Sequence, residues 1–292
     1  MPFKLIKGEF RIIGAAPDGD SIRFYPTAER AFERAGVNAR VNRAGGAQLR
    51  LDGIDTLETH YAPQVGGTGV LHQPLAIGHA AADHLLKQFG FTKVERNTDE
   101  TVTHAEPEST PGYIFTRFAD QYGRCVAFAF PGECDQDDLD TVFVNANMLS
   151  ASGNHHVLSA GLGYPTYYSK LFPDLRQAFT DAVTTARAGG KGLWPEDVTN
   201  VGFIVDGLAT LTDDVVIMPK LFRRLVDYLA LNDGDPSPDG LSDYLAARED
   251  RLLIVSRGHV TGFDNTVEIN GQNVRLMYPP EDLVFLEKKP TS

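Results

Sequence analysis

The sequence lacks any apolar run close to the ~20 residues that a membrane-spanning helix needs. Its first eight residues, MPFKLIKG, also lack the long apolar stretch followed by small residues that marks a secretory signal. The 292 residues are 42% hydrophobic and 23% charged, which is typical of a soluble globular protein. We therefore expect a cytoplasmic protein, or one whose leader has been removed, with one large or two modest domains.

Cysteine is scarce, and Cys125 and Cys134 are the two in the chain. A disulfide between them would join an apolar strand to the loop that follows it. A cysteine on an apolar strand is more often a reduced core residue, which weakly favours a reducing compartment. The sequence leaves both states of the pair open.

An excess of positive charge is absent as well. The formal net charge is −12 and the pI is near 5.1, and residues 201–292 carry 15 acidic against 9 basic residues, half of that net charge. A protein that binds nucleic acid tightly is usually basic where it meets the phosphate backbone. The acidity therefore excludes broad electrostatic capture of nucleic acid, and any such binding must use a local positive cleft.

What the sequence does contain is a concentration of charged and apolar residues at 49–58, LRLDGIDTLE. Leu49 and Leu51 are predicted to point to one face of a strand and Arg50 to the other, because side chains alternate along a strand. Gly53 then lets the backbone bend, so that the two carboxylates at the end of the stretch turn toward the side that Arg50 faces.

Two further segments supply what this stretch lacks. Residues 18–21, DGDS, place two carboxylates on a turn that leads into the strand-like IRFY. Residues 120–124, DQYGR, place a second arginine on a turn that leads into the apolar CVAFAF. We expect the three segments to meet in one pocket that holds both a cation and a phosphate.

In this order and at this kind of spacing, D-G-D-S, R-L-D-G-I-D-T-x-E and Y-G-R resemble the staphylococcal (thermo)nuclease family. Residues 142–149, VFVNANML, are similar to the start of a family helix in which an asparagine ties the helix to a barrel. Residues 161–168, GLGYPTYY, are similar to a family strand that ends in tyrosines, and residues 192–194, GLW, to the end of the family domain. The resemblance covers roughly residues 8–196 and implies an α+β fold, a five-stranded OB-like β-barrel with packed helices.

Within this first domain, taken as residues 1–198, apolar residues at helical spacing predict helices over 73–89 and 173–187. Residues 27–43 and 95–112 are predicted to be insertions. The second is expected to be a polar, acidic loop. The first has mixed charge and helix formers, so it forms either a solvated helix face or an extended phosphate-binding surface. The basic residues of that surface would be Arg30, Arg34, Arg40 and Arg43.

Residues 199–292 show no motif of the family and are predicted to form a small α+β extension of unknown role. A helix is expected from Pro219 to the Asn232-Asp233-Gly234 stop. Asn270-Gly271 is a strong hairpin turn. The other expected elements are a short helix over 241–247 and strands over 252–255, 266–269 and 274–277. We expect the extension to pack against the first unit or to form an oligomer contact, because it clusters no metal-like or nucleophilic residues.

The resemblance implies one bound divalent cation, Ca²⁺, held by the carboxylates of Asp20 and Asp55 and by the backbone carbonyl of Thr56. Such a hard cation takes oxygen ligands, and water and phosphate would complete the set. Two carboxylates alone hold Ca²⁺ loosely, which suits a site completed by its substrate. Asp18 either acts through a water molecule or is a turn residue whose side chain bonds its own backbone.

The resemblance also implies how the phosphodiester would be attacked. Glu58 would orient or deprotonate the attacking water. Arg50 and Arg124 would bind the phosphate and neutralise the charge that grows on its oxygens, since the planar guanidinium matches two of them. The alternatives are a helix-capping glutamate and two arginines in surface salt bridges.

Tyr167 and Tyr168 would stack on the nucleotide or hydrogen-bond to it, and the alternative is that they are ordinary strand tyrosines. Two positions depart from the family pattern. Leu57 stands where proline is common, which removes a restraint on the backbone before Glu58. Ser21 replaces the usual threonine and keeps the hydroxyl.

These observations predict a calcium-dependent phosphodiester hydrolase, a nuclease acting on single-stranded or frayed DNA or RNA with little sequence preference. All of the charged positions are filled, whereas a domain kept only for binding would be expected to have lost at least one. The alternative is a non-catalytic OB module that binds nucleic acid or a protein partner through the barrel and the extension.

Overall fold

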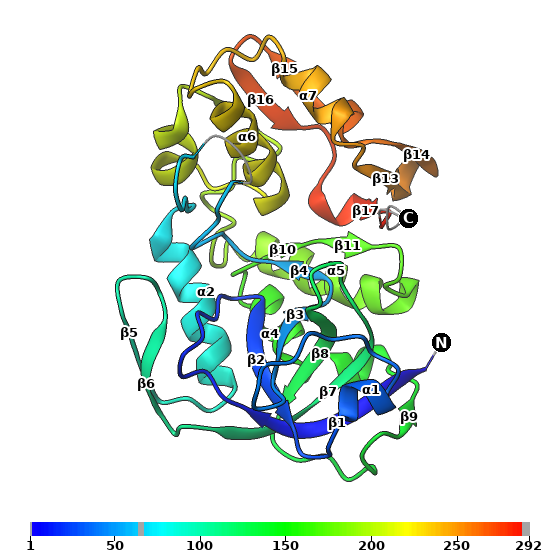
Figure 1. The fold of residues 1–292 in the computed structure, drawn as a ribbon. Helices are drawn as coiled ribbons and strands as arrows, with labels where there is room; N and C mark the ends of the chain where they lie inside the picture. Colours follow the sequence, from blue (N-terminus) through cyan, green and yellow to red (C-terminus); the bar gives the residue numbers. More distant parts are fainter. Residues whose placement is uncertain (1, 64–66, 288–292) are drawn as a thin grey trace.

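The structure, a computed structural model, describes residues 2–63 and 67–287, and its N-terminal half builds a closed β-barrel (Figure 1). The barrel strands are β1 (Phe3–Phe10), β2 (Ser21–Pro26), β3 (Ala47–Leu51), β7 (Thr110–Ala119) and β8 (Cys125–Pro131). They pair in the order β1-β2-β3-β8-β7 and return to β1. The β3–β8 pair is parallel and the others are antiparallel. The predicted five-stranded OB-like barrel is therefore confirmed.

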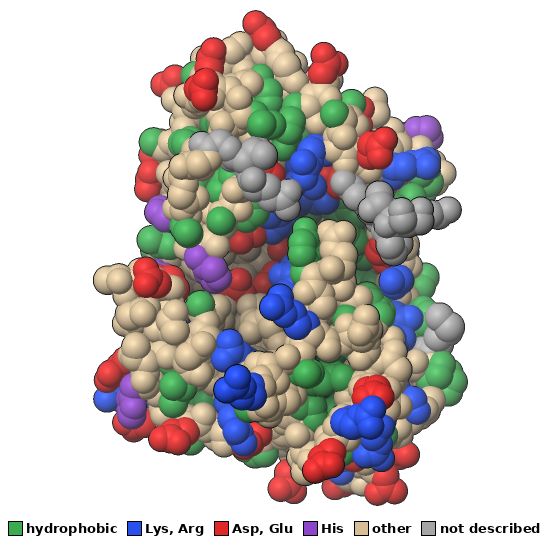
Figure 2. Space-filling view, in the orientation of Figure 1, with side chains coloured by type: hydrophobic (Ala, Val, Ile, Leu, Met, Phe, Trp, Pro, Cys, Tyr) green, Lys and Arg blue, Asp and Glu red, His purple; other side chains and the backbone are tan. Residues whose placement is uncertain are grey.

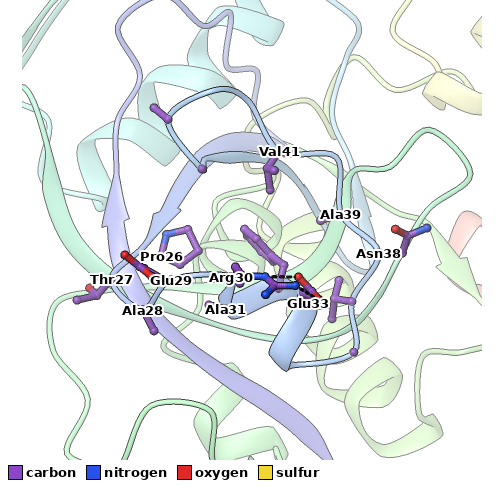
Figure 3. A pocket seen from close by; sticks show the side chains of 15 residues that line it. Pro26, Thr27, Ala28, Glu29, Arg30, Ala31, Glu33, Asn38, Ala39 and Val41 are labelled. Carbon is purple, nitrogen blue, oxygen red and sulfur yellow. Dashed lines mark hydrogen bonds and ion pairs between the residues drawn. The ribbon is translucent and has the colours of Figure 1, made fainter.

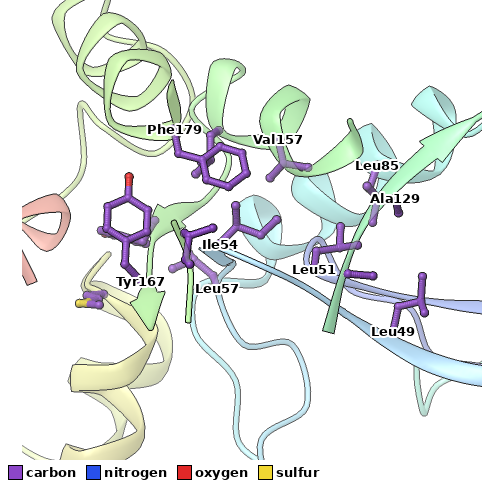
Figure 4. Close-up of a cluster of buried hydrophobic side chains, with 14 of the residues drawn as sticks. Leu49, Leu51, Ile54, Leu57, Leu85, Ala129, Val157, Tyr167 and Phe179 are labelled. Carbon is purple, nitrogen blue, oxygen red and sulfur yellow. The ribbon is translucent and has the colours of Figure 1, made fainter. Parts of the chain in front are cut away.

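Alternation along the strands decides which side chains fill the barrel. In β3, Ala47, Leu49 and Leu51 are buried, whereas Arg50 is only partly buried and faces the other way, as predicted. Figure 4 shows Leu49 and Leu51 in the apolar cluster that continues through Ile54 toward the helices. The apolar face of β3 thus anchors the strand, and its opposite face carries the charge.

Helices cover one side of the barrel (Figure 1). They are α2 (Leu75–Gln88), α3 (Ala146–Leu149), α4 (Gly153–Ser159) and α5 (Pro173–Ala188). The helices predicted over 73–89 and 173–187 are confirmed, and Pro173 occupies the first turn of α5, where its missing N–H costs nothing.

Two asparagines share the role that the resemblance gave to one. Asn145 caps α3, since its side chain accepts a hydrogen bond from Met148 N at 3.0 Å. The buried Asn154 of α4 ties the helices to the barrel. It accepts a hydrogen bond from Ala129 N and donates to the carbonyls of Asp52 and Ala127.

The first insertion is mostly irregular. It forms one short helix, α1 (Ala31–Arg34), whose Phe32 packs into the core. The four arginines of the insertion are exposed. Together with its flanking residues it lines a cavity of about 780 Å³ (Figure 3). No residue of the predicted site lines this cavity, so its size does not make it the place of the chemistry.

The second insertion was predicted to be a loop, and this prediction is wrong. The hairpin β5 (Lys93–Arg96) and β6 (Val102–Glu106) forms there, and β7 already begins at Thr110. Val102 and Ala105 are buried, which is enough to hold the hairpin on the protein. In the sequence, the acidic residues around the turn favoured a loop more strongly than these two apolar residues favoured a strand.

Short strands connect the barrel to the rest of the chain. They are β4 (Ile54–Asp55), β9 (Thr141–Val142), β10 (Tyr164–Pro165) and β11 (Tyr167–Tyr168). β4 pairs with β10, and β9 extends the barrel sheet beyond β1. In Figure 1, β4, β10 and β11 lie between the barrel and the C-terminal part of the molecule.

The C-terminal part is a small α+β unit, as predicted. Its helices are α6 (Pro219–Leu231) and α7 (Leu241–Ala247), with a π-helical turn η1 (Thr210–Asp214) and the 3-10 turns η2 (Val255–Arg257), η3 (Phe263–Thr266) and η4 (Pro280–Asp282). Its strands are β12 (Phe203–Ile204), β13 (Arg251–Ile254), β14 (His259–Gly262), β15 (Val267–Asn270), β16 (Asn273–Leu276) and β17 (Leu283–Phe285). The hairpin at Asn270-Gly271 is confirmed by the β15–β16 pairing.

This part packs against the barrel unit, which was one of its two predicted uses. Buried side chains of both parts belong to one continuous apolar core. β17 pairs in parallel with β11, so a strand of the C-terminal part extends the segment that carries Tyr167 and Tyr168. Docking is therefore through both core packing and backbone hydrogen bonds.

The structure also bears on the predictions about the two cysteines and about membrane-spanning segments. Cys125 is buried and Cys134 is partly buried, and both are free thiols. Among the residues that the structure describes, no helix has the length and apolar character that crossing a membrane requires.

Candidate active site

The pairing of β2 with β3 brings the first two charged residues together. Ser21 lies opposite Arg50, and Leu51 N donates to the carbonyl of Asp20 at 2.8 Å. Arg50 Nη1 is consequently 3.7 Å from Asp20 Oδ2. The D-G-D-S turn and the arginine strand thus meet as the sequence predicted.

Two glycines shape the backbone around this contact. Gly53 has a φ of +82°, and a Cβ there would lie 2.5 Å from the ring of Phe179, so only glycine permits the bend. A Cβ at Gly19 would lie 2.6 Å from the methyl carbon of Thr56. The turn that carries Asp20 can therefore approach Thr56 closely.

Asp55 is brought to the same place by β4, which leaves the bend and pairs with β10. Its carboxylate is 2% exposed and lies 3.6 Å from Arg50 Nη2. Glu58 follows one turn later, where its backbone N–H donates to Gln73 Oε1 at 3.2 Å. Two of the three predicted segments, residues 18–21 and 49–58, therefore bring together Asp20, Arg50, Asp55 and Glu58.

The structure adds a residue that sequence reasoning missed, Arg223 of α6. Its Nη2 donates to Asp55 Oδ2 at 2.6 Å and its Nη1 to Asp55 Oδ1 at 3.3 Å. Nη1 also donates to Glu58 Oε1. One guanidinium from the C-terminal part thus bridges the predicted cation ligand and the predicted base.

Burial and charge set the ionisation of this group. Burial raises the pKa of Asp20 well above its usual range, and Asp18 raises it further, against a lowering by Arg50. Burial alone would also raise the pKa of Asp55, but Arg223 and then Arg50 lower it to about 2. Asp55 therefore carries the negative charge, while Asp20 tends to hold a proton.

Glu58 is in an intermediate position. Burial raises its pKa, Arg223 opposes this, and Asp55 and Asp18 raise the pKa further. Asp18 itself leaves one oxygen, Oδ1, buried and without a hydrogen-bond partner in the described part of the chain. An unpaired buried carboxylate oxygen beside three other carboxylates is a place where a cation or a water molecule would be stabilised.

The donor set fits a calcium ion in its chemistry. Asp20 and Asp55 offer carboxylate oxygens, Thr56 is packed against the turn of Asp20, and the unpartnered oxygen of Asp18 lies nearby. Within residues 2–63 and 67–287, no group of three or more His, Cys, Asp or Glu is arranged to hold a metal ion. The predicted set has only two side-chain carboxylates, so this finding leaves it untested.

Arg124 lies apart from these residues in its contacts. Its Nε donates to Asp120 Oδ2 at 2.7 Å, and its guanidinium lies 5.5 Å from the ring centre of Tyr122. The side chain is 35% exposed. The turn therefore supplies its own counter-ion for the arginine that the resemblance placed on the phosphate.

The two tyrosines of β11 point in opposite directions, as neighbours on a strand do. Tyr167 is fully buried, and its hydroxyl shares a hydrogen bond with Thr180 Oγ1 at 2.9 Å, so in this structure it offers nothing to a ligand. Figure 4 shows it beside Phe179 in the core. Tyr168 is partly buried and is an electrostatic neighbour of both Arg50 and Arg223. Tyr168 is therefore the one beside the charged group.

A hollow lies between the two parts of the molecule. Figure 2 shows acidic and basic side chains gathered in a recess between the barrel and the C-terminal part, where Figure 1 draws β4 below α6. The contacts of Arg223 with Asp55 and Glu58 join these same elements, and the side chains of Arg50, Glu58 and Arg223 are 15–19% exposed, so the charged group borders this recess.

One signal in the sequence would have pointed to Arg223. Residues 220–224, KLFRR, place three basic residues on one predicted helix within an extension that is otherwise acidic. The apolar residues of that helix predict that it packs against the rest of the protein, but they do not show what its basic residues face.

A scan against models of known protein families and a search among curated proteins each found no match to this chain.

Proposed function

We propose that this chain is a divalent-cation-dependent phosphodiester hydrolase, a nuclease of the kind that its motifs resemble. The observation that supports this most is the convergence of Asp20 from the D-G-D-S turn with Arg50, Asp55 and Glu58 from residues 49–58. Nearly buried carboxylates with shifted pKa values beside arginines are typical of functional sites, although structural ion-pair networks share this feature.

The chain's own residues divide the work. Glu58 takes the proton of the attacking water, because it shares Arg223 with the cation ligand Asp55 and is not itself one of the predicted ligands. Arg50 binds the phosphate. Its guanidinium has five N–H donors and makes no hydrogen bond to any residue that the structure describes, since its two carboxylate neighbours are 3.6 and 3.7 Å away.

Asp20 and Asp55 would hold the cation together with the carbonyl of Thr56. A calcium ion bound there would supply positive charge to the phosphate oxygens. Because burial raises the pKa of Asp20, cation binding there would be favoured by rising pH.

The recess favours a single strand as substrate. Asp55 is 2% exposed and its partners are 15–19% exposed, so a flexible single strand reaches these side chains more easily than the wide, stiff backbone of an intact duplex. The net charge of −12 also disfavours capture of long duplexes. We accordingly expect single-stranded or frayed DNA and RNA to be cut, with little sequence preference.

The test is digestion of single-stranded DNA and RNA with Ca²⁺ or with EDTA. Glu58→Gln should lower kcat about 100-fold or more, because it removes the base but keeps the side-chain volume. Glu108→Gln, on an exposed loop, is the matched control and should cleave as the wild type does. A folded Glu58→Gln that cleaves at the wild-type rate would reject the base, and a wild type that never cleaves would reject the enzyme.

A non-catalytic OB module is the second candidate, and one observation favours it. Arg223 already pairs with both Asp55 and Glu58, so the two carboxylates that chemistry needs are engaged when no ligand is bound. Such a module would bind a fluorescent oligonucleotide equally well with Ca²⁺ and with EDTA, without cutting it. Anisotropy measured beside the digestion assay separates the two.

A further inference from the structure

Two guanidinium groups flank one carboxylate in the recess. Arg50 Nη2 and Arg223 Nη1 both approach Asp55 Oδ1, at 3.6 and 3.3 Å. Asp20 also lies 3.7 Å from Arg50, and Glu58 accepts a hydrogen bond from Arg223, so carboxylates hold the two guanidinium groups side by side. Two guanidinium groups held together in this way can bind the oxygens of one phosphate between them.

Both arginines have hydrogen-bond donors to spare. Arg50 makes no hydrogen bond within the described residues. Arg223 spends Nη1 and one hydrogen of Nη2 on Asp55 and Glu58, and its Nε–H has no partner among the residues described. No donor of either residue is among the fully buried polar atoms that lack a partner in the described residues, and their side chains are 15% and 19% exposed. The spare donors therefore face solvent, where the oxygens of a ligand can reach them.

Within the described residues, Arg124 makes no hydrogen bond or ion pair with this group, although the resemblance assigns it to the phosphate. Its Nε is bonded to Asp120, and both the Asp120 side chain and the arginine belong to the same turn. Moving its guanidinium to a ligand would break that pair. Arg223 needs no such movement to reach the group that contains Arg50.

The helix that carries Arg223 is firmly held. Gln73, which is fully buried, accepts from Glu58 N and donates to the carbonyl of Ile217 just before α6. On the next turn, Asp227 accepts a hydrogen bond from Tyr61 of the barrel unit at 2.9 Å. Arg223 is thus preorganised over the site.

We propose that Arg223 is the second phosphate-binding arginine of this site, so that the barrel and the C-terminal part build the site together. This inference rests on the proposed function and names the residue that completes it. The phosphate group of a nucleotide is held by Arg50 from β3, by Arg223 from α6 and by the hydroxyl of Tyr168. Arg223 keeps its bond to Glu58 and gives its longer contact with Asp55 to the phosphate.

The experiment measures binding without requiring cleavage. Adenosine 3′,5′-bisphosphate is titrated into the full-length protein by calorimetry, with Ca²⁺ and with EDTA, and adenosine is titrated as the probe without phosphate. Arg223→Gln should weaken bisphosphate binding about 10- to 100-fold, the usual effect of losing a charge-assisted hydrogen bond. Arg124→Gln, the matched control, should weaken it less than about 3-fold, since exposed charges contribute little.

Arg223→Lys is the control for a loss of binding that is caused only by misfolding. It keeps the charge that Asp55 and Glu58 need but loses the planar fork, so it should bind bisphosphate with intermediate affinity. Binding by Arg223→Gln and Arg223→Lys at the wild-type level would overturn the proposal, as would a larger loss in Arg124→Gln. A wild type that binds no bisphosphate would also overturn it.

The outcomes separate this inference from the proposed function. If the predicted loss is found but the wild type does not cut nucleic acid, the phosphate site stands and the nuclease falls. If the wild type cuts with Ca²⁺ and Arg124→Gln loses more than Arg223→Gln, the nuclease stands and the assignment of Arg223 falls.

Discussion

Arg124 on the barrel and Arg223 on α6 occupy opposite surroundings. Arg124 is paired with Asp120, four residues earlier in the chain, and a third of its side chain is exposed. Arg223 is paired with Asp55 and Glu58, more than 160 residues away, and its side chain is half as exposed. The first pair is a local property of one turn, whereas the second exists only when the two parts of the molecule are docked.

The contrast between the exposed local pair and the buried distant pair shows which of them contributes to stability as well as to the candidate site. A local, exposed pair can be lost at little cost, because water replaces the partner. A buried pair between distant segments loses its compensation when one partner is removed, because the remaining charge stays out of water. The recess is therefore both the candidate active site and part of what holds α6 on the barrel.

The largest expected effect comes from removing the shared partner of the two buried arginines. Asp55→Asn should lower the free energy of unfolding by about 3–5 kcal/mol, because Arg50 and Arg223 lose the carboxylate between them. The matched variant Asp120→Asn keeps the acceptor oxygen of the turn and should cost less than about 1 kcal/mol. Urea unfolding of both variants measures the contrast, and equal losses would contradict it.

The same residue predicts an acid dependence. The pKa of Asp55 is lowered from 3.8 to about 2, so its contribution is fully present above pH 4 and is lost as the pH falls toward 2. The difference between wild type and Asp55→Asn should shrink over that range. A difference that stays constant down to pH 2 would show that the two arginines do not hold the carboxylate.

The site residues that the barrel contributes could be predicted from the sequence, because each of them follows from a pattern within a few neighbouring residues. Leu49, Arg50 and Leu51 follow strand alternation, and Gly53 marks the bend that the structure shows. The order of the motifs predicted that the Asp20 turn meets the Arg50 strand, and it does. It also predicted that the Arg124 turn joins them, whereas Arg124 pairs with Asp120 of its own turn. The helix of Arg223 was also predicted, but its partners were not, because no local pattern states which distant carboxylates a helix will face.

Two other misses have physical causes as well. The β5–β6 hairpin is held by a few buried side chains such as Val102 and Ala105, a signal weaker than the acidic residues around it. The direction of the β11 tyrosines depends on how β17 pairs beside them, so Tyr167 and Tyr168 looked equivalent in the sequence. Tertiary packing decided both.

A smaller effect is expected at Gln73, the buried amide that joins the two regions. Gln73→Leu should lower the free energy of unfolding by about 2–3 kcal/mol, because Glu58 N and the carbonyl of Ile217 would lose their partners. The control is Gln48→Leu on β3, whose amide bonds only to Ser21 of the neighbouring strand, at about 1 kcal/mol or less.

Amide hydrogen exchange sharpens this comparison. In Gln73→Leu, the amides of α6 should exchange faster than in the wild type, while those of β3 should change little, because the lost bonds anchor the C-terminal part. Faster exchange spread evenly over the barrel and α6 would mean that Gln73 supports the whole fold and not the docking of α6.

The smallest effect is a pH dependence on the same helix, at Lys220. Burial lowers the pKa of Lys220 to about 7, which Asp250 opposes and Arg224 reinforces. In the unfolded chain its pKa returns to about 10.5, so above pH 7 the unfolded state binds more protons than the folded state. Stability contributed by this residue must therefore rise with pH.

Lys220→Met removes this term and keeps an apolar side chain of similar length over Phe285. The free energy of unfolding of the wild type minus that of the variant should increase between pH 7 and pH 9. Cys125 titrates with a pKa raised to about 12 by burial and acts in the opposite direction above pH 9, but it is present in both proteins and cancels in the difference. A difference that falls or stays flat over this range would mean that Lys220 remains charged. All three basic residues of α6, Lys220, Arg223 and Arg224, would then be buried as ions, because the carboxylates of the barrel and of Asp250 compensate their charge.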